Sequence, residues 1–127
     1  MSNIAYVEVR HNPTTDQLEA DPPELQLHDG IDHVVWWCSN LPPDGLLQIL
    51  FDGSAEGPFV ELQTQNDLVI GSGNAGLVSC YPYLIRVQAS QVQWQGQATV
   101  DNLIEEPDFN WESLVCETPR SGPPVCY

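Results

Sequence analysis

The histidines of this chain all lie in its first third, at positions 11, 28 and 33. His28 and His33 flank a predicted Asp29-Gly30 turn, so their imidazoles could face one another, and Asp29 or Asp32 would add a carboxylate. Imidazole nitrogen and carboxylate oxygen are ordinary ligands of zinc and copper. The four residues are therefore candidate metal ligands, against the commoner alternative of exposed histidines in a turn and at a strand edge.

The cysteines could also carry chemistry, as thiolate ligands, nucleophiles or disulfides. Cys116 and Cys126 bracket a proline-rich loop near the C-terminus and would close it as a disulfide. The four cysteines lack the close CxxC spacing of a structural zinc site. Cys38 or Cys80 could act as a nucleophile only if the fold placed His33 beside it as a base.

Neither glycine-rich loops nor carboxylate pairs identify an enzyme. Gly71–Gly76 lacks the pattern of a nucleophile elbow and the lysine of a phosphate-binding loop. Glu105 with Glu106, or Asp52 with Glu56, would suit glycoside hydrolysis. Calcium would be suited by the loop acids Asp29, Asp32, Asp44, Asp52 and Glu56. Because acids are abundant in this chain, a solvated acidic surface explains them as well. We therefore assign no catalytic residue and no cofactor.

The charge balance limits the classes of partner. The chain of 127 residues has 18 acidic residues against three arginines, which gives a net charge of −15. Such a charge repels phosphate backbones and anionic lipid surfaces, so we expect neither nucleic acid nor membrane as a partner. It would attract a basic protein surface or a cation, or it would serve only solubility.

The elements that must position these residues are short strands. Prolines and glycines interrupt the chain about every ten residues, and helical periodicity is nearly absent. His33–Ser39 is the strongest strand, and its continuous apolar run indicates cover on both faces. Other strands are expected in segments that alternate or end at turn residues: 4–10, 17–20, 24–28, 46–52, 67–70, 77–88 and 93–102, with 59–62 as a short turn or strand. The length and this pattern predict one all-β domain, a Greek-key sandwich of seven or eight strands.

The order of these signals resembles that of cupredoxin-like and immunoglobulin-like sandwiches, and in particular a group of small bacterial proteins on that scaffold. The resemblance rests on Asp29-Gly30 before Val34–Trp37, on Leu41–Gly45, on the Gly71–Gly76 turn, and on the tyrosine-rich segment Tyr81–Val87. It implies a blue-copper site of histidines, a cysteine and a methionine. This chain departs from that pattern, because no histidine follows Cys80 and Met1 is the only methionine.

The immunoglobulin resemblance also implies a bridge between the sheets, which would join Cys38 to Cys80. The alternative, which we favour, is that both remain free, buried thiols. Two disulfides would imply an oxidising compartment. The N-terminus has no basic segment followed by an apolar one, so we expect a cytoplasmic protein, and a periplasmic or extracellular one if the cysteines are paired.

Aromatic residues are the remaining signal. Trp36 and Trp37 must point to opposite faces of their strand, so one fills the core and the other faces the tail or a partner. Trp37, Trp94, Phe109 and Trp111 are candidate interface residues, although the last two could simply dock the tail. We expect residues 1–104 to form the sandwich and the acidic, proline-rich residues 105–127 to pack on it.

These expectations favour a non-enzymatic interaction or structural module that binds another protein or itself. An exposed edge strand or a loop end would make the contact. Two alternatives stay open: a metal-binding or redox relative of cupredoxins with nonstandard ligands, and a hydrolase with an unrecognised carboxylate site.

Overall fold

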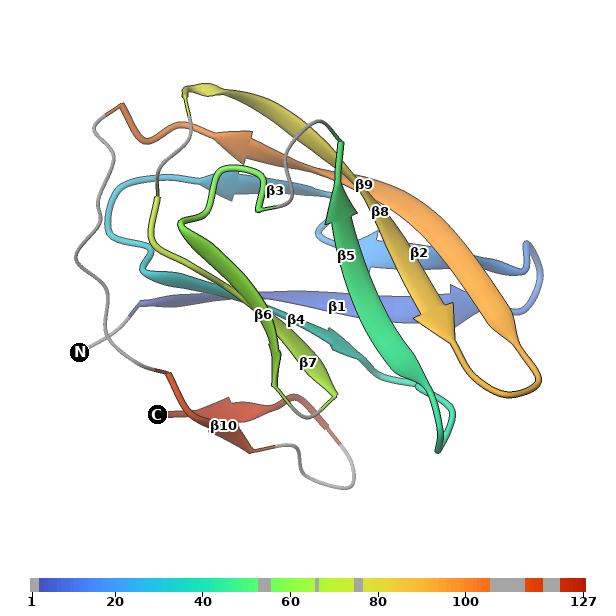
Figure 1. The fold of residues 1–127 in the computed structure, drawn as a ribbon. Helices are drawn as coiled ribbons and strands as arrows, with labels where there is room; N and C mark the ends of the chain where they lie inside the picture. Colours follow the sequence, from blue (N-terminus) through green and yellow to red (C-terminus); the bar gives the residue numbers. More distant parts are fainter. Residues whose placement is uncertain (1–2, 53–55, 66, 75–76, 106–113, 118–121) are drawn as a thin grey trace.

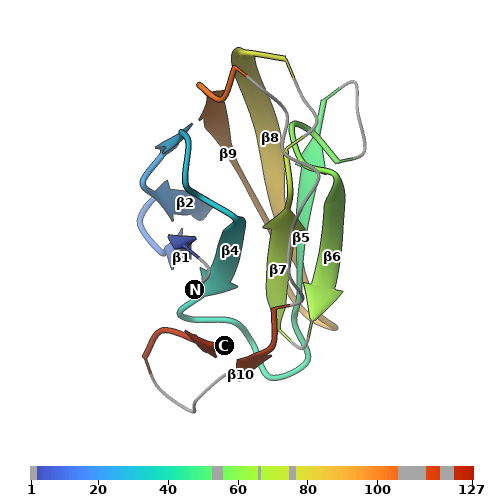
Figure 2. The same ribbon diagram turned by 90° about the vertical axis from the view of Figure 1, so that its left-hand side faces the viewer.

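A computed structural model describes residues 3–52, 56–65, 67–74, 77–105, 114–117 and 122–127. In this part of the chain the regular structure consists of strands, without a helix. Two larger sheets pack against each other, and a small two-stranded sheet lies against the outer face of one of them (Figure 1 and Figure 2). The chain is therefore all-β, as its composition and punctuation predict.

The first larger sheet has the strand order β2-β1-β4-β7-β6 and the second has β3-β9-β8-β5. Most neighbours are antiparallel, but β1 pairs with β4, and β3 with β9, in parallel. The strand bounds in the five-stranded sheet are β1 (Ile4–Asn12), β2 (Gln17–Asp21), β4 (His33–Cys38), β6 (Glu61–Gln65) and β7 (Leu68–Ser72). Those elsewhere are β3 (Glu24–Leu27), β5 (Leu46–Phe51), β8 (Ser79–Gln88), β9 (Gln93–Asn102), β10 (Cys116–Glu117) and β11 (Val125–Cys126).

Trp36 lies fully buried in the core between the two larger sheets. Its ring meets Tyr83, Phe51 and Phe59 edge to face, with the Tyr83 ring centroid 5.7 Å away. The indole Nε1 donates a hydrogen bond of 3.1 Å to the Tyr83 hydroxyl. A buried indole N–H needs such an acceptor, so Tyr83 provides both apolar surface and the required partner.

The opposite face of β4 is also covered. Val35 and the half-buried Trp37 pack with Leu114 and Cys116 from the C-terminal segment. This cover explains why β4 has a continuous apolar run instead of alternation. Trp36 and Trp37 thus lie on opposite faces, as the twofold period of a strand requires.

One side of the molecule is closed by a change of sheet between β2 and β3. Pro22-Pro23 separates the two strands, and proline cannot donate to a ladder, so the chain leaves one sheet and joins the other. The Asp21-Pro22 peptide bond is cis. Nearby, β2 crosses β9 so closely that a Cβ on Gly96 would overlap the carbonyl oxygen of Leu18.

The segment after β5 differs from the expected elements. Phe59 is a core residue beside Trp36, and the strand begins at Glu61, not at residue 59. In the described residues the two larger sheets hold nine strands, more than the expected seven or eight. Glu61–Gln65 is polar and without apolar alternation, so its strand arises from backbone pairing with β7, which sequence periodicity cannot reveal.

Candidate functional site

The candidate metal ligands are close in sequence but serve different local contacts. His33 is buried at the start of β4, with Nδ1 2.9 Å from the Ser72 hydroxyl on β7. His28 is exposed in the turn. The Asp32 carboxylate accepts a hydrogen bond of 3.0 Å from the Asn3 backbone N–H. Among the described residues, no three His, Cys, Asp or Glu side chains are placed to hold a metal ion.

The third histidine has a contact that the sequence did not indicate. His11 stacks on Trp94, with ring centroids 3.8 Å apart and an angle of 7° between the planes. Its Nε2 lies 2.8 Å from the Asp16 carboxylate. Asp16 ends the turn between β1 and β2, so its proximity to His11 follows from hairpin geometry. The contact with Trp94 depends instead on the packing of the two sheets.

Cys38 and Cys80 are free thiols, so the bridge between the sheets is not formed. Cys80 is exposed, which differs from the expected buried thiol, because it lies near the start of β8 on the outer side of its sheet. Burial raises the pKa of the partly buried Cys38 thiol, which disfavours the reactive thiolate. His33 and Cys38 are at opposite ends of β4, roughly 16 Å apart at strand rise, so they do not form a nucleophile–base pair.

Cys116 and Cys126 are bonded as a disulfide that joins β10 to β11. Cys116 is buried against the five-stranded sheet together with Leu114. The cross-link therefore holds β10 and β11 together in the cluster that includes Trp37. A disulfide is typical of proteins from oxidising compartments, although it does not identify one.

The acidic residues of the loops make different local contacts in the described part of the chain. Asp44 accepts a hydrogen bond of 2.9 Å from the Ser90 backbone N–H, and its bonds to Ser90 lower the pKa of the carboxyl. It thereby ties the loop before β5 to the turn between β8 and β9. Glu105 is exposed, and Glu106 lies outside the described residues.

The two candidate interface aromatics in the described residues, Trp37 and Trp94, do not share a surface. Trp37 packs on the outer face of the five-stranded sheet, whereas Trp94 packs against the core between the sheets. Phe109 and Trp111 lie outside the described residues. The described half of the set is thus divided between two clusters, because β4 and β9 belong to different sheets.

The edge strands differ sharply in charge, which sequence reasoning did not detect. The two larger sheets end at β2, β6, β3 and β5. Acidic residues lie in the first three of these strands: Glu19 and Asp21 in β2, Glu61 in β6, and Glu24 in β3. Strand β5, Leu-Leu-Gln-Ile-Leu-Phe, has no charged residue. Edge charge and proline normally prevent unwanted strand pairing, and β5 has neither within its bounds.

Backbone groups of β5 point away from the sheet at alternate residues. The Asp52 N–H donates to the Pro82 carbonyl oxygen on β8 at 3.4 Å, so even-numbered residues of this segment direct their backbone groups toward β8. Alternation leaves the N–H and C=O of Leu47, Ile49 and Phe51 on the outer edge. The side chains of these same three residues are buried, which holds the edge groups in place.

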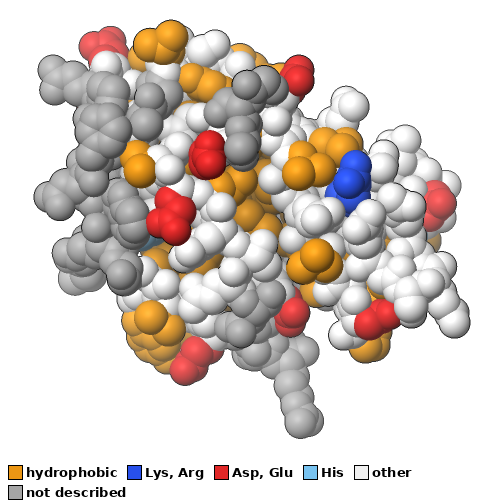
Figure 3. Space-filling view, in the orientation of Figure 1, with side chains coloured by type: hydrophobic (Ala, Val, Ile, Leu, Met, Phe, Trp, Pro, Cys, Tyr) orange, Lys and Arg blue, Asp and Glu red, His pale blue; other side chains and the backbone are white. Residues whose placement is uncertain are grey.

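Next to this edge, the outer surface of the four-stranded sheet carries three rows of side chains without an acid. We call this surface the amide face, and it consists of Leu46, Gln88 and Gln93, then Gln48, Arg86 and Gln95, then Leu50, Leu84 and Gln97. In the view of Figure 3, the basic side chain on the right lies beside hydrophobic ones, and the acidic side chains in view lie apart from it. A protein with net charge −15 thus has a locally acid-free surface.

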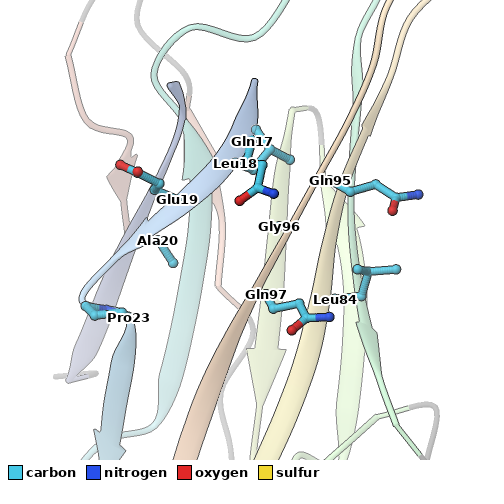
Figure 4. A pocket seen from close by; sticks show the side chains of 9 residues that line it. All are labelled: Gln17, Leu18, Glu19, Ala20, Pro23, Leu84, Gln95, Gly96 and Gln97. Atoms are coloured by element: carbon cyan, nitrogen blue, oxygen red, sulfur yellow. The ribbon is translucent and has the colours of Figure 1, made fainter. Parts of the chain in front are cut away.

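Two hollows border the amide face. One, of about 660 Å³, is lined by residues of β5, β8 and β9, including Leu50, Leu84 and Gln97. The other, of about 670 Å³, lies where β2 passes over β9, and Gln17 and Leu18 lie across from Gln95 and Gln97 (Figure 4). Leu84 and Gln97 line both hollows, so the depressions adjoin along the sheet.

Polar atoms of the middle row lack partners. The Nε atom of Arg86 is enclosed and has no hydrogen-bond partner among the described residues. The Oε1 atom of Gln48, which lies opposite Arg86 on β5, is also enclosed and has no hydrogen-bond partner in the described part of the chain. Arg10, by contrast, forms an ion pair of 2.7 Å with Glu8. Enclosed polar atoms without partners are uncommon in folded proteins, which sets this row apart from the other two.

Comparison with models of known protein families and with curated proteins gave no match. No helix in the described residues is long and apolar enough to cross a membrane. The β5 edge and the amide face are therefore the features from which a role is inferred.

Proposed function

We propose that this protein is a non-enzymatic interaction module that binds an extended segment of another protein or of a second copy along β5. The added segment would continue the order β3-β9-β8-β5 by one strand. The observation that carries the proposal is that β5 combines an uncharged sequence with outward backbone groups at Leu47, Ile49 and Phe51. Main-chain bonds would supply affinity, and side-chain contacts beside the edge would supply selectivity.

The architecture we propose is an immunoglobulin-like Greek-key sandwich. If β4 to β9 are taken as six consecutive strands B to G, the sheets contain B-E-D and C-F-G, as in immunoglobulin domains. The covering strand β3, parallel to β9, and the pairing of β1 with β4 are additions to this core. Such scaffolds host many activities, so the role is argued from the β5 edge and not from the fold.

Selectivity would come from the side chains that flank the open edge. Leu46 is 44% exposed and Leu50 is 39% exposed, with Gln48 between them on the same face. An added strand would place alternate side chains beside these three residues, within reach of the hollow near Leu50. We therefore expect partner segments that have apolar residues at alternate positions and no run of acids.

Selection of short peptides from a displayed library on the immobilised protein tests this function. Enriched peptides should bind the wild type and lose affinity roughly tenfold or more for Leu50→Lys, because a charge at the edge opposes strand addition. The control is Gln63→Lys, which introduces the same charge into β6, the edge of the other sheet. Binding should be unchanged in that variant.

N-methylation of the peptide gives a second test that separates strand pairing from side-chain contact. Methyl groups on the amides that face β5 should abolish binding, whereas methyl groups on the intervening amides should leave it nearly intact, because only alternate amides enter a ladder. Equal binding to Leu50→Lys, or equal tolerance of both methylation patterns, would contradict the proposed function.

A further inference from the structure

We infer that the strand which β5 receives is β5 of a second copy of this chain, joined antiparallel around a twofold axis. This inference rests on the proposed function and names its partner. An antiparallel pair of identical strands forms a closed, self-complementary contact, the commonest symmetry among protein oligomers. The result would be one continuous sheet across both copies.

Charge supports a second copy. Two chains that each carry −15 repel one another, so a contact between copies must lie where acids are absent. Of the four edge strands in the two larger sheets, only β5 has no acid within its bounds, and Asp52 follows directly after it. The amide face beside it contributes Arg86 and no acid. A basic partner would instead be attracted to the acidic remainder of the surface.

The outward backbone groups limit the register. In a ladder between two copies, residues with outward backbone groups must lie opposite each other, and these are Leu47, Ile49 and Phe51. The twofold axis therefore passes through the position of one residue of β5 and not between two residues. With Ile49 opposite Ile49 of the second copy, Leu50 faces Gln48 and Asp52 faces Leu46. With Gln48 opposite Gln48, the turn residue Asp44 would come near Asp52, both just outside β5, and like charges so placed repel. With Leu50 opposite Leu50, only Ile49–Phe51 of the two strands would be paired.

The Ile49-centred register is therefore the one we infer. In it, Leu50 and Gln48 of different copies form a pair without mutual backbone hydrogen bonds, in which Cβ atoms approach to about 5 Å. That approach permits a disulfide between cysteines substituted at these two positions. Cysteines at two copies of the same position would be farther apart.

The first arm of the experiment measures self-association by sedimentation equilibrium across a dilution series of the full chain. We expect a monomer–dimer equilibrium that Leu50→Lys weakens roughly tenfold or more and Gln63→Lys leaves unchanged. Leu46→Lys is a second edge variant in case Leu50→Lys does not fold, which thermal unfolding will report. A dimer that is insensitive to the folded edge variants would overturn the inference.

The second arm measures the register by cross-linking in a Cys80→Ser background, which removes the exposed native thiol. Gln48→Cys chains mixed with Leu50→Cys chains should form disulfide-linked dimers under diamide, and each variant alone should form few. Efficient cross-linking of Gln48→Cys alone would overturn the Ile49-centred register. The Cys80→Ser chain without a further substitution is the control, because it reports any cross-linking through Cys38.

The outcomes also separate this inference from the proposed function. A chain that stays monomeric at every concentration overturns the second copy as partner. The peptide selection described above would then decide independently whether β5 accepts a strand from another protein. If the chain stays monomeric and the selected peptides also fail to bind along β5, the proposed function is overturned as well.

Discussion

At the scale of single residues, the Trp36–Tyr83 pair shows how one contact meets several physical requirements. The two rings pack edge to face, and the hydroxyl accepts the indole hydrogen bond. Burial raises the pKa of Tyr83 to about 12, only partly opposed by the hydrogen bond from Trp36. The phenol is therefore held neutral in the core, and its protonation is coupled to folding.

This coupling predicts how stability depends on alkaline pH. The folded pKa of Tyr83 is about 12 against an ordinary value of 10.0, so the unfolded chain releases the proton first as pH rises. Below pH 10 the titration of Tyr83 does not change the free energy of unfolding. Between pH 10 and 12 the free energy of unfolding falls by on the order of 2 kcal/mol for a pKa shift of this size.

The measurement is urea unfolding across this pH range for the wild type and Tyr83→Phe. The variant should lose about 1 kcal/mol at neutral pH, where the indole N–H loses its acceptor, and should show a shallower alkaline decline. Tyr81→Phe, at a half-buried position on the same strand, is the matched control. Parallel alkaline curves for the wild type and Tyr83→Phe would show that Tyr83 is not the titrating group.

At the scale of elements, the two sides of the sandwich differ in how their edge strands are protected from pairing with another chain. On one side, Pro22-Pro23 and the crossing of β2 over β9 protect the edges, and acids lie on both edge strands. On the other side, β6 carries Glu61 and β5 carries no charge. The unprotected strand is therefore the exception in a fold that otherwise manages its edges, which is why we assign it the interaction.

The crossing of β2 over β9 makes a prediction about Gly96. A methyl group there would overlap the Leu18 carbonyl, which is backbone and cannot rotate away, so Gly96→Ala should destabilise the protein by about 1–3 kcal/mol. Gln97→Ala, at the next, exposed position of β9, should change stability by about 0.5 kcal/mol or less. Chemical unfolding of both variants tests this, and equal stabilities would show that the strands separate at little cost.

At the scale of the whole molecule, charge is the dominant property. A net charge of −15 on 127 residues opposes compaction as well as association. The disulfide between Cys116 and Cys126 and the two-sided burial of β4 work against that repulsion. Binding along β5 would occur where the repulsive field is locally weakest.

Self-repulsion predicts that salt stabilises the folded chain. Raising sodium chloride shortens the Debye length and screens the acids, so the thermal midpoint should rise by a few degrees, the shift that about 1 kcal/mol produces in a domain of this size. Sucrose at matched osmolality controls for general solute effects. A midpoint that stays constant or falls in salt would mean that specific ion pairs outweigh the repulsion.

Several features follow from the amino-acid sequence because they depend on neighbours along the chain. The strands, the turn at Asp29-Gly30, the strand break at Pro22-Pro23 and the opposite faces of Trp36 and Trp37 arise from local dihedral preferences and a twofold side-chain period. The Asp16 contact of His11 belongs to the same class, since a short turn returns the chain to β1.

The tertiary structure alone decided which strands lie at the edges, because strand order depends on pairings between segments far apart in sequence. It set His11 on Trp94, kept Cys38 and Cys80 unbonded, and left β5 as the uncharged edge. Residue types show that β5 lacks charge, but they do not show that it has an open side. That distinction requires the positions of all neighbouring strands, since an edge is defined by what fails to pair with it.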